Sequence, residues 1–344
     1  MTGVHVQTSD AASINEAADR LRVGEVVVIP TETVYGLGAS TLDERALSKV
    51  FSLKDRPPNN PLIAHVLDGA HASTVVSGWD EQCQQLADAF WPGPLTMILN
   101  RRPEVPPIAS GGRNTLAVRS PSHPVARAVL TAFGGPISAP SANRSNRISP
   151  TLASHVIDDY QGVEAANGIL VLDGGACDFG IESTVLDMTT TVPTILRPGS
   201  ITQSAIANVI GSIESSQPEA QTHSPGTSGR HYAPRTPMCL LEYSELEAEL
   251  QSTNGSNAII IFTQKPNGSG PGDTIYTLPD DPVTCGGMLY STLREIDKLH
   301  VDRILVERPP NGSEWDAVRD RFQRGSVDVS TTRSAGGGSS GGSS

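Results

Sequence analysis

A short basic segment offers the first chemistry in the sequence. In KDRPPNNPL, residues 54–62, Lys54 and Arg56 stand two positions apart and would project to one side of an extended chain. The two prolines that follow fix their own φ and disfavour a helix at Arg56, and Asp55 could orient one of the cations. Because an Arg fork and a compact Lys charge both suit phosphate, the segment predicts a stiff anion-binding elbow. An exposed, helix-ending turn is the alternative.

Polar side chains also follow other strand-like segments, where Pro or Gly turns come next. The loop PTETVYGLG, residues 30–38, gathers three hydroxyl groups and a carboxylate, which suits an amino acid or an alcohol-bearing ligand. Because ligands of open α/β sheets bind beyond strand ends, we expect one polar, anion-binding crevice, although each loop alone could be a solvated turn. Its members are Thr31, Glu32, Thr33, Tyr35, Arg119, Ser141, Asn143, Arg144, Arg147, Glu182, Ser183, Thr184 and Arg197.

Several common catalytic motifs are missing from the sequence. It has no G-x-x-x-x-G-K-[ST] phosphate loop and no G-x-S-x-G nucleophile elbow. The stretch GLGAST, residues 36–41, lacks the third glycine of a dinucleotide fingerprint, which favours a turn between a strand and a helix. If the protein uses ATP, side chains must therefore hold the phosphates. His65, His123 and His231 could make polar contacts, although a structural histidine is the commoner case.

Composition limits the classes of protein and of site. The 344 residues carry 25 Lys and Arg against 37 Asp and Glu, a formal net charge of −12, which argues against holding nucleic acid by bulk charge. A local basic cleft stays open. The four cysteines are widely spaced, which favours buried free thiols over a zinc site or disulfides. With no metal-ligand cluster in the sequence, we expect no dedicated metal site, and any Mg²⁺ would arrive with ATP.

The chain shows no targeting or membrane signal. Its N-terminus lacks a basic segment followed by an apolar one, as a signal peptide would have. The longest apolar runs, such as VVVIP, have the length of a strand. We therefore expect a cytoplasmic protein.

Helical and strand patterns mix through residues 1–211, which predicts one large α/β domain. A capping box of Thr41 and Glu44 predicts one helix start, and Ser149 before Pro150 predicts another. Other expected helices cover 11–21, 79–91, 123–135 and 202–211, and expected strands cover 25–30, 61–67, 94–100, 115–120, 136–140, 168–175, 183–188 and 193–199.

The pattern changes after residue 211. Residues 212–237 are rich in Ser, Pro, Gly and Thr, which predicts a linker. Strands and helices then alternate over residues 238–330, which predicts a small domain with a parallel sheet. The Gly- and Ser-rich tail, residues 331–344, predicts flexible coil.

Six segments in this order resemble the YrdC-like family. They are PTETVYGLG, KDRPPNNPL, WPGPLT, APSANRSNRISPT, FGIESTVLD and LRPGSIT, and the likeness covers about residues 8–211. The segment SPGTSGRHYAPRTP and the small domain after it resemble the long form of the family, the two-domain L-threonylcarbamoyladenylate synthases. The resemblance implies a twisted, open, mixed sheet followed by a small Rossmann-like domain.

The resemblance also implies a reaction. Enzymes of this kind condense L-threonine, bicarbonate and ATP into threonylcarbamoyl-AMP and release pyrophosphate. A separate enzyme complex then moves the threonylcarbamoyl group to the tRNA adenosine beside the anticodon, so transient contact with tRNA or with that complex is expected.

Two other functions stay open at this point. One is a non-catalytic YrdC-like module that grips RNA through its arginines. The other is a carbamoyltransferase relative of the hydrogenase-maturation kind, although the acylphosphatase and zinc-finger segments of those proteins are absent from the sequence.

Individual roles follow only from the resemblance. It implies that Lys54 and Arg56 are catalytic, and that threonine is held by Thr33, His65, Arg119 and Ser183. It implies that ATP is held by Lys54, Arg56, Asn60, Thr115, Ala139, Ser141, Asn143, Ser149, Arg197 and Tyr232, with Tyr232 and its linker, residues 212–237, closing over the site. The chain departs from the family at Thr227, Ser228 and Gly229, where relatives often carry Pro-Gly-Met and then basic and aromatic residues.

Overall fold

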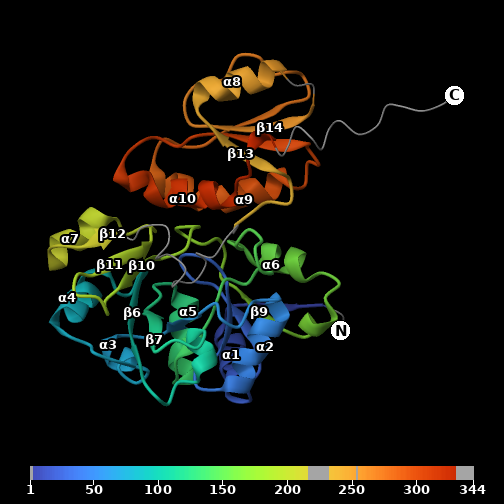
Figure 1. The fold of residues 1–344 in the computed structure, drawn as a ribbon. Helices are drawn as coiled ribbons and strands as arrows, with labels where there is room; N and C mark the ends of the chain where they lie inside the picture. The colour runs from blue at the N-terminus through green and yellow to red at the C-terminus, as the bar shows by residue number, and fades with distance from the viewer. Residues whose placement is uncertain (1–2, 216–231, 253–254, 331–344) are drawn as a thin grey trace. The chain divides into compact units, whose positions relative to one another are not determined.

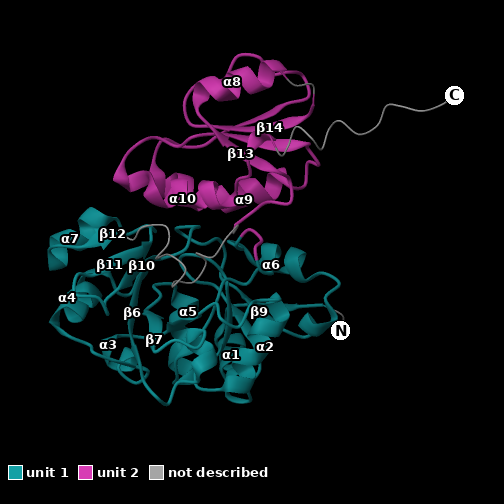
Figure 2. Ribbon diagram, in the orientation of Figure 1, with its two compact units in different colours: residues 1–145, 149–228 teal, residues 146–148, 229–344 magenta. Residues whose placement is uncertain are grey.

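The computed structural model describes residues 3–215, 232–252 and 255–330 (Figure 1). The chain forms two compact units (Figure 2). Unit 1 comprises residues 1–145 and 149–228, and unit 2 comprises residues 146–148 and 229–344. The expected flexible tail, and residues 216–231 of the expected linker, lie outside the described residues.

Unit 1 is built on one large mixed sheet. Its strands follow the order β1-β9-β2-β3-β8-β4-β7-β6-β10-β11-β12, with β5 paired to β6. The sheet contains both parallel pairs, such as β4 with β7, and antiparallel pairs, such as β6 with β7. The strands are β1 His5–Thr8, β2 Val27–Ile29, β3 Gly36–Ser40, β4 Ile63–His65, β5 Val76–Ser77, β6 Leu95–Arg101, β7 Thr115–Arg119, β8 Ile137–Ser138, β9 Leu170–Asp173, β10 Thr184–Asp187, β11 Thr194–Arg197 and β12 Glu214–Ser215.

Helices cover both faces of this sheet because its central strands are apolar on both sides. Val27 and Ile29 pack into a core with helices α1 and α5, whereas Val28 between them joins the core on the opposite face. Burial of each such side chain contributes about 1.5–3 kcal/mol. The helices are α1 Ala11–Arg22, α2 Glu44–Lys54, α3 Gly69–Ala72, α4 Glu81–Phe90, α5 Pro124–Phe133, α6 Ala153–Tyr160 and α7 Gln203–Ile210.

Unit 2 has the parallel sheet that the alternating pattern predicts. The strand order is β13-β16-β14-β15, and every pair in it is parallel. Helix α8 lies on one face, and α9 and α10 lie on the other (Figure 1). The elements are β13 Met238–Leu241, α8 Tyr243–Ser252, β14 Asn257–Ile261, β15 Thr274–Thr277, α9 Pro282–Ile296, β16 Arg303–Glu307 and α10 Asp316–Gly325.

The glycine-rich stretch after the first loop is a strand, so the prediction of a turn there is wrong. Gly36 and Gly38 lie in β3, between β2 and β8. A Cβ added at Gly36 would come within 3.1 Å of the Ala139 side chain, and one at Gly38 within 3.0 Å of Ile137. The glycines are therefore needed for close strand packing, which a phosphate-loop comparison does not reveal.

Both predicted helix caps are also wrong. Asp43, rather than Thr41, caps α2: its Oδ1 accepts from the backbone N–H groups of Arg45 and Ala46. The Thr41 hydroxyl lies 3.0 Å from that of Ser138. Ser149 precedes α6 by four residues, and α6 begins after Leu152 without a side-chain cap. In both cases a contact distant in sequence takes the hydroxyl away from the helix end.

The predicted free thiols are confirmed. Cys83, Cys177, Cys239 and Cys285 are all buried and unbridged. Within residues 3–215, 232–252 and 255–330, no helix combines the length and apolar character that a bilayer-crossing segment needs.

Candidate active site

Strand alternation places several predicted site residues on one face of the unit 1 sheet. Along β7, Thr115 and Arg119 share a face with Ala117, and along β4, His65 shares a face with Ile63. Ile63 and Ala117 belong to a small apolar cluster with Ile98, Val185 and Leu196. The polar residues therefore stand at the ends of strands whose middles form an apolar floor. Thr115 and Arg119 lie about 13 Å apart at the usual strand rise.

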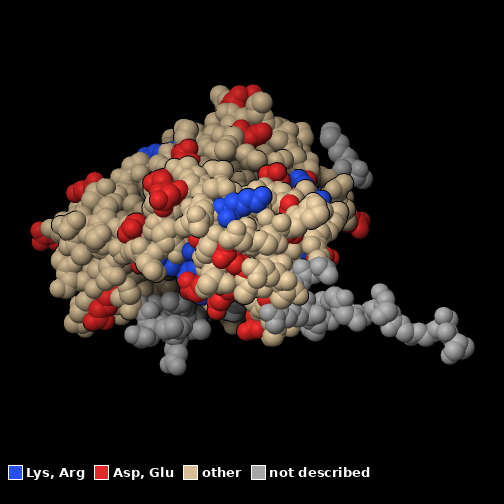
Figure 3. Space-filling model, turned by 90° about the horizontal axis from the view of Figure 1, so that it is seen from above, with Lys and Arg blue, Asp and Glu red and all other residues tan. Residues whose placement is uncertain are grey.

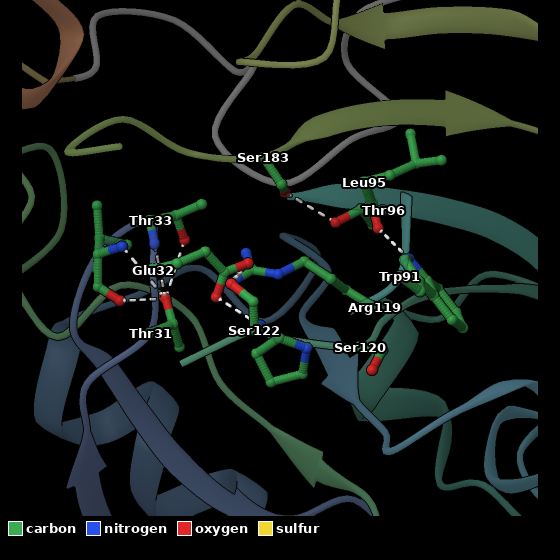
Figure 4. A network of polar contacts seen from close by, with 12 residues as sticks. Thr31, Glu32, Thr33, Trp91, Leu95, Thr96, Arg119, Ser120, Ser122 and Ser183 are labelled. Atoms are coloured by element: carbon green, nitrogen blue, oxygen red, sulfur yellow. Dashed lines mark hydrogen bonds and ion pairs between the residues drawn. The ribbon is translucent and has the colours of Figure 1, made fainter. Parts of the chain in front are cut away.

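Arg119 and Glu32 form a buried ion pair at this face. Arg119 is 3% exposed and Glu32 is 0% exposed. Arg119 Nη2 lies 3.2 Å from Glu32 Oε1, but among the described residues neither atom has a hydrogen-bond partner, and neither does Arg119 Nε. Glu32 Oε2 accepts from the backbone N–H of Ser122 at 3.1 Å. Figure 4 shows the Arg119 guanidinium and the Glu32 carboxylate facing each other beside Thr31 and Thr33.

A second guanidinium group, that of Arg197, lies near this pair. Burial lowers the pKa of Arg119, the Glu32 carboxylate opposes that shift, and neighbouring Arg197 adds to it. Burial and the Arg119 charge also lower the pKa of His65 to about 3, so its imidazole is neutral near pH 7. Arg119 and Arg197 thus place two guanidinium groups beside the Glu32 carboxylate, and such buried cations can hold a bound anion.

The orientation of His65 follows from its strand pairing. Its Nδ1 lies 3.2 Å from the carbonyl oxygen of Ile137 in β8, its partner residue across the sheet. Because a carbonyl can only accept, we assign the ring proton to Nδ1. Nε2 is then an acceptor for a ligand hydroxyl.

Ser183 connects the Arg197 guanidinium to the Thr96 hydroxyl of β6. The Ser183 hydroxyl lies 2.8 Å from that of Thr96. Arg197 Nε and Nη2 donate to the Ser183 carbonyl oxygen at 3.2 and 3.0 Å, and Nη2 lies 3.2 Å from its hydroxyl. Arg197 thus fixes the backbone that presents a predicted threonine contact, and Figure 4 shows the link from Ser183 to Thr96.

The loop before β3 is fixed by its own hydroxyls. Thr31 Oγ1 donates to the carbonyl oxygen of Val34 at 2.7 Å and lies 2.9 Å from Thr33 Oγ1. The backbone N–H of Phe179 donates to the carbonyl oxygen of Glu32 at 2.8 Å. This turn of hydrogen bonds holds Glu32 inward.

Lys54 is held by backbone carbonyl groups at the end of α2. Its Nζ donates to the carbonyl oxygen of Ser141 at 2.5 Å and also to that of Asn143. The backbone N–H of Ser145 donates to the Lys54 carbonyl oxygen at 2.9 Å. Burial and the neighbouring Arg56 charge lower the pKa of the Lys54 ammonium, and Asp159 opposes the shift. Lys54, Ser141 and Asn143, which come from two of the predicted motifs, are therefore brought together.

The chain between Lys54 and Arg56 is not extended, so that part of the prediction is wrong. Lys54 ends α2, and Asp55 has a left-handed conformation with φ 51°. Asp55 pairs with Arg144 instead of either cation. Arg56 Nη2 donates to Asn60 Oδ1 at 2.7 Å and to the Pro61 carbonyl oxygen at 2.8 Å, so the proline-rich turn holds Arg56 through its carbonyl and amide oxygens.

The remaining predicted ATP residues are spread over several elements. Ala139 follows β8, and its N–H donates to the Ile63 carbonyl oxygen at 3.0 Å. Ser149 donates from its hydroxyl to Glu182 Oε1 at 2.6 Å. Tyr232 belongs to unit 2, where it stacks with Tyr290 at 5.8 Å and lies 5.2 Å from the guanidinium carbon of Arg321. Its assignment to ATP stays a prediction.

Comparison with known proteins decides the family. Residues 19–199 match the family described as telomere recombination, and residues 201–326 match the threonylcarbamoyl-AMP synthase C-terminal domain. The threonylcarbamoyl-AMP synthase of Pyrococcus abyssi is 36% identical over 328 residues, covering 91% of this chain and 94% of that protein. The Bacillus subtilis synthase is 37% identical over 338 residues, covering 93% and 96%.

The chain belongs to the threonylcarbamoyl-AMP synthase family. The resemblance read from the six motifs is thereby confirmed, and with it the enzyme class, a nucleotidyltransferase. A solved structure of P. abyssi Sua5 in complex with L-threonine is 33% identical with a TM-score of 0.84, covering 95% of this chain and 97% of that one. This match confirms the predicted fold class of a mixed α/β sheet with a second small α/β domain.

Membership in the threonylcarbamoyl-AMP synthase family does not by itself explain Glu32, Thr96 or Ser122. The sequence offers Glu32 as one polar residue of a loop and gives Thr96 no signal, because it lies inside an apolar strand. Their contacts with Arg119 and Ser183 exist only once β2, β6 and β7 are assembled.

Proposed function

We propose that this chain condenses L-threonine, bicarbonate and ATP into threonylcarbamoyl-AMP and pyrophosphate. The observation that carries the proposal is Arg119: a buried guanidinium that keeps N–H groups without partners among the described residues. A buried donor in that state costs free energy unless a ligand completes it. A carboxylate on the substrate is the natural acceptor for such a fork.

The threonine end is built around Arg119, with hydroxyls, a neutral imidazole and the Glu32 carboxylate beside it. Arg119 binds the substrate carboxylate, and the hydroxyls of Thr33 and Ser183 lie on the elements beside it. His65 Nε2 accepts from the substrate hydroxyl. A site that satisfies a substrate hydroxyl rejects analogues without one, since its own polar group is then left unpaired.

The nucleotide end uses Lys54 and Arg56 in place of a glycine loop. Both cations are held against oxygen atoms of the chain, and phosphate oxygens would replace or share those contacts. The other ATP contacts of the proposal are Asn60, Thr115, Ala139, Ser141, Asn143, Ser149, Arg197 and Tyr232. Phosphoryl chemistry of this kind depends on positioning and charge stabilisation, so no protein nucleophile is required.

Magnesium enters the proposal as the companion of ATP. In the described part of the chain, no three His, Cys, Asp or Glu side chains come together as a metal site would need. The ion would bind triphosphate oxygens and add positive charge there. Lys54 and Arg56 supply the fixed charge of the protein at that end.

The product would feed tRNA modification through a separate enzyme complex. An RNA-gripping module without catalysis is the competing function, and it needs a broad basic surface. On the face in Figure 3, acidic side chains are scattered among the few Lys and Arg of the described residues, and the net charge is −12. Direct, tight tRNA binding is therefore not part of the proposal.

The test is the product itself. The full chain, incubated with L-threonine, bicarbonate and ATP, should yield threonylcarbamoyl-AMP by mass spectrometry and threonine-dependent pyrophosphate. Arg56→Ala should abolish both while the far-UV circular dichroism stays unchanged. Arg22→Ala, an exposed ion-pair residue of α1, is the matched control and should keep full activity. Salt-dependent RNA binding with no ATP consumption by the wild type would overturn the proposal.

A further inference from the structure

We infer that Glu32 is the residue that recognises the amino group of the substrate. The inference rests on the proposed function, because it assigns a further contact within the threonine site. Arg119 and Glu32 would together form the complement of an α-amino acid, with the guanidinium on the carboxylate and the Glu32 carboxylate on the ammonium. Nothing in the family resemblance gives Glu32 this role.

The geometry singles out one oxygen of Glu32. Oε2 is used by the backbone N–H of Ser122, at 3.1 Å. Oε1 is buried, and among the described residues no donor makes a hydrogen bond to it. Arg119 does not donate a hydrogen bond to Oε1 either. Its Nη2 lies 3.2 Å from Oε1, within ion-pair distance, but the geometry of the contact is not that of a hydrogen bond. A fully buried carboxylate oxygen without a donor is an unusual and costly arrangement.

The spacing of the two groups fits a zwitterion. In an α-amino acid one carbon separates the ammonium nitrogen from the carboxylate carbon, so the two charges lie within a few ångströms. Arg119 Nη2 and Glu32 Oε1 lie equally close, with opposite polarity. A substrate seated on the unpartnered N–H groups of Arg119 brings its ammonium into reach of Oε1, and each member of the buried pair then gains a second opposite charge.

Two other carboxylates lie in this region: Glu182, which precedes Ser183, already accepts from the Ser149 hydroxyl at 2.6 Å through Oε1, and Asp178 acts on the thiol of Cys177 together with Glu32. Thr31, Thr33 and Ser183 present hydroxyls, and His65 and Arg197 present a neutral ring and a cation. The ammonium would otherwise meet two guanidinium groups, which repel it. Glu32 is thus the group that allows an amino acid, rather than any small carboxylate, to enter a positively charged site.

A positioning role for Glu32 predicts a different pattern of binding. If Glu32 only orients Arg119, every ligand with a carboxylate depends on it equally. If it binds the ammonium, only ligands with an amino group depend on it. Two analogues separate these cases: 3-hydroxybutanoate keeps the carboxylate and hydroxyl of threonine without the amine, and threonine methyl ester keeps the amine without the carboxylate.

The first experiment uses the wild-type full chain in titration calorimetry. Threonine should bind at least about tenfold more tightly than 3-hydroxybutanoate, the order expected when a buried charge loses its partner. Equal affinities would overturn the inference without any variant. If the wild type makes threonylcarbamoyl-AMP yet shows equal affinities, the proposed function stands and only the role of Glu32 fails. If it neither binds threonine nor makes the product, both fail.

The second experiment adds Glu32→Gln, which keeps the size of the side chain and removes its charge. The affinities for threonine and for its methyl ester should both fall about tenfold or more, while that for 3-hydroxybutanoate stays the same or rises. An equal fall for threonine and 3-hydroxybutanoate would show a positioning role and overturn the inference. Glu249→Gln, at the buried Arg–Glu pair of unit 2, is the matched control and should leave all three affinities unchanged.

Discussion

Two buried Arg–Glu pairs, one in each unit, differ in how fully they are satisfied. In unit 2, Arg303 Nη1 donates to Glu249 Oε1 at 2.5 Å, and its Nε donates to Asn257 Oδ1 at 2.8 Å. In unit 1, Arg119 and Glu32 lie 3.2 Å apart without a hydrogen bond between them. Both pairs are almost completely buried, so burial alone does not separate them.

The difference lies in what the surrounding chain supplies. Arg303 starts β16, and its partner Asn257 starts β14 and donates in turn to Asp273 Oδ1 at 2.7 Å. Such a closed network links strands and leaves little for a ligand to add. Arg119 ends β7 at a sheet face with a polar rim, and its free N–H groups are completed only from outside. Hydrogen-bond completeness thus distinguishes a structural pair from a binding pair.

Breaking the Arg303–Glu249 pair of unit 2 should give the largest effect on stability. Arg303→Ala leaves the Glu249 carboxylate buried without its cation, which typically costs about 3–5 kcal/mol. Hydrogen exchange should show lost protection in β14 and β16, with β7 unchanged, and the KM for threonine should stay at the wild-type value. Unchanged protection in β16 would mean that the network of unit 2 does not hold its strands together.

Changing the Arg119–Glu32 pair of unit 1 should instead affect activity. Arg119→Lys keeps a cation beside Glu32 but loses the planar fork that binds a carboxylate. We expect kcat/KM for threonine to fall about a hundredfold, on the order of 3 kcal/mol, while the free energy of unfolding changes by about 1 kcal/mol or less. If Arg119→Lys lowers the free energy of unfolding as much as Arg303→Ala does and leaves kcat/KM for threonine unchanged, then Arg119 has a structural role like that of Arg303.

How far the sequence predicts these features depends on their range. The parallel sheet of unit 2 is predicted because strands and helices alternate locally, and β7 is predicted together with the polar Arg119 at its end. The left-handed Asp55 is not predicted, since nothing in KDRPPNNPL distinguishes it from an extended residue. Glu32 and Thr96 are not predicted as partners because each contacts a residue 87 positions further along the chain: Glu32 contacts Arg119 at the end of β7, and Thr96 contacts Ser183 just before β10.

The neutral state of His65 provides a smaller, pH-dependent test of the region around Arg119 and Glu32. Its pKa is about 3 in the folded protein and about 6.5 in an unfolded chain. The unfolded chain therefore binds the extra proton as the pH falls below 6.5, and stability contributed by neutral His65 is lost progressively from there down to pH 3. Between pH 6.5 and 5 the loss should be about 2 kcal/mol.

The measurement is urea unfolding across that pH range, compared with His65→Asn. The variant lacks the titrating ring, so its stability should change less steeply between pH 6.5 and 5. Parallel curves for the two proteins would mean that His65 is not held neutral beside Arg119. The unit 2 pair provides the contrast, because Arg303 donates to Asn257 and to Glu249 and the pair itself contains no histidine.

The contact between Thr96 and Ser183 should have the smallest effect, because it acts through another residue. Thr96→Val keeps the shape of the β6 side chain and removes the hydroxyl that lies 2.8 Å from Ser183 Oγ. Ser183 keeps its contacts with Arg197, so the KM for threonine should rise only about five- to tenfold, the order of one hydrogen bond, with kcat unchanged. Asn257→Ala, in the closed network of unit 2, should show the opposite pattern of lower stability at constant KM. If Thr96→Val destabilises the fold and leaves KM unchanged, the Thr96 hydroxyl stabilises the sheet and does not support the threonine site around Arg119.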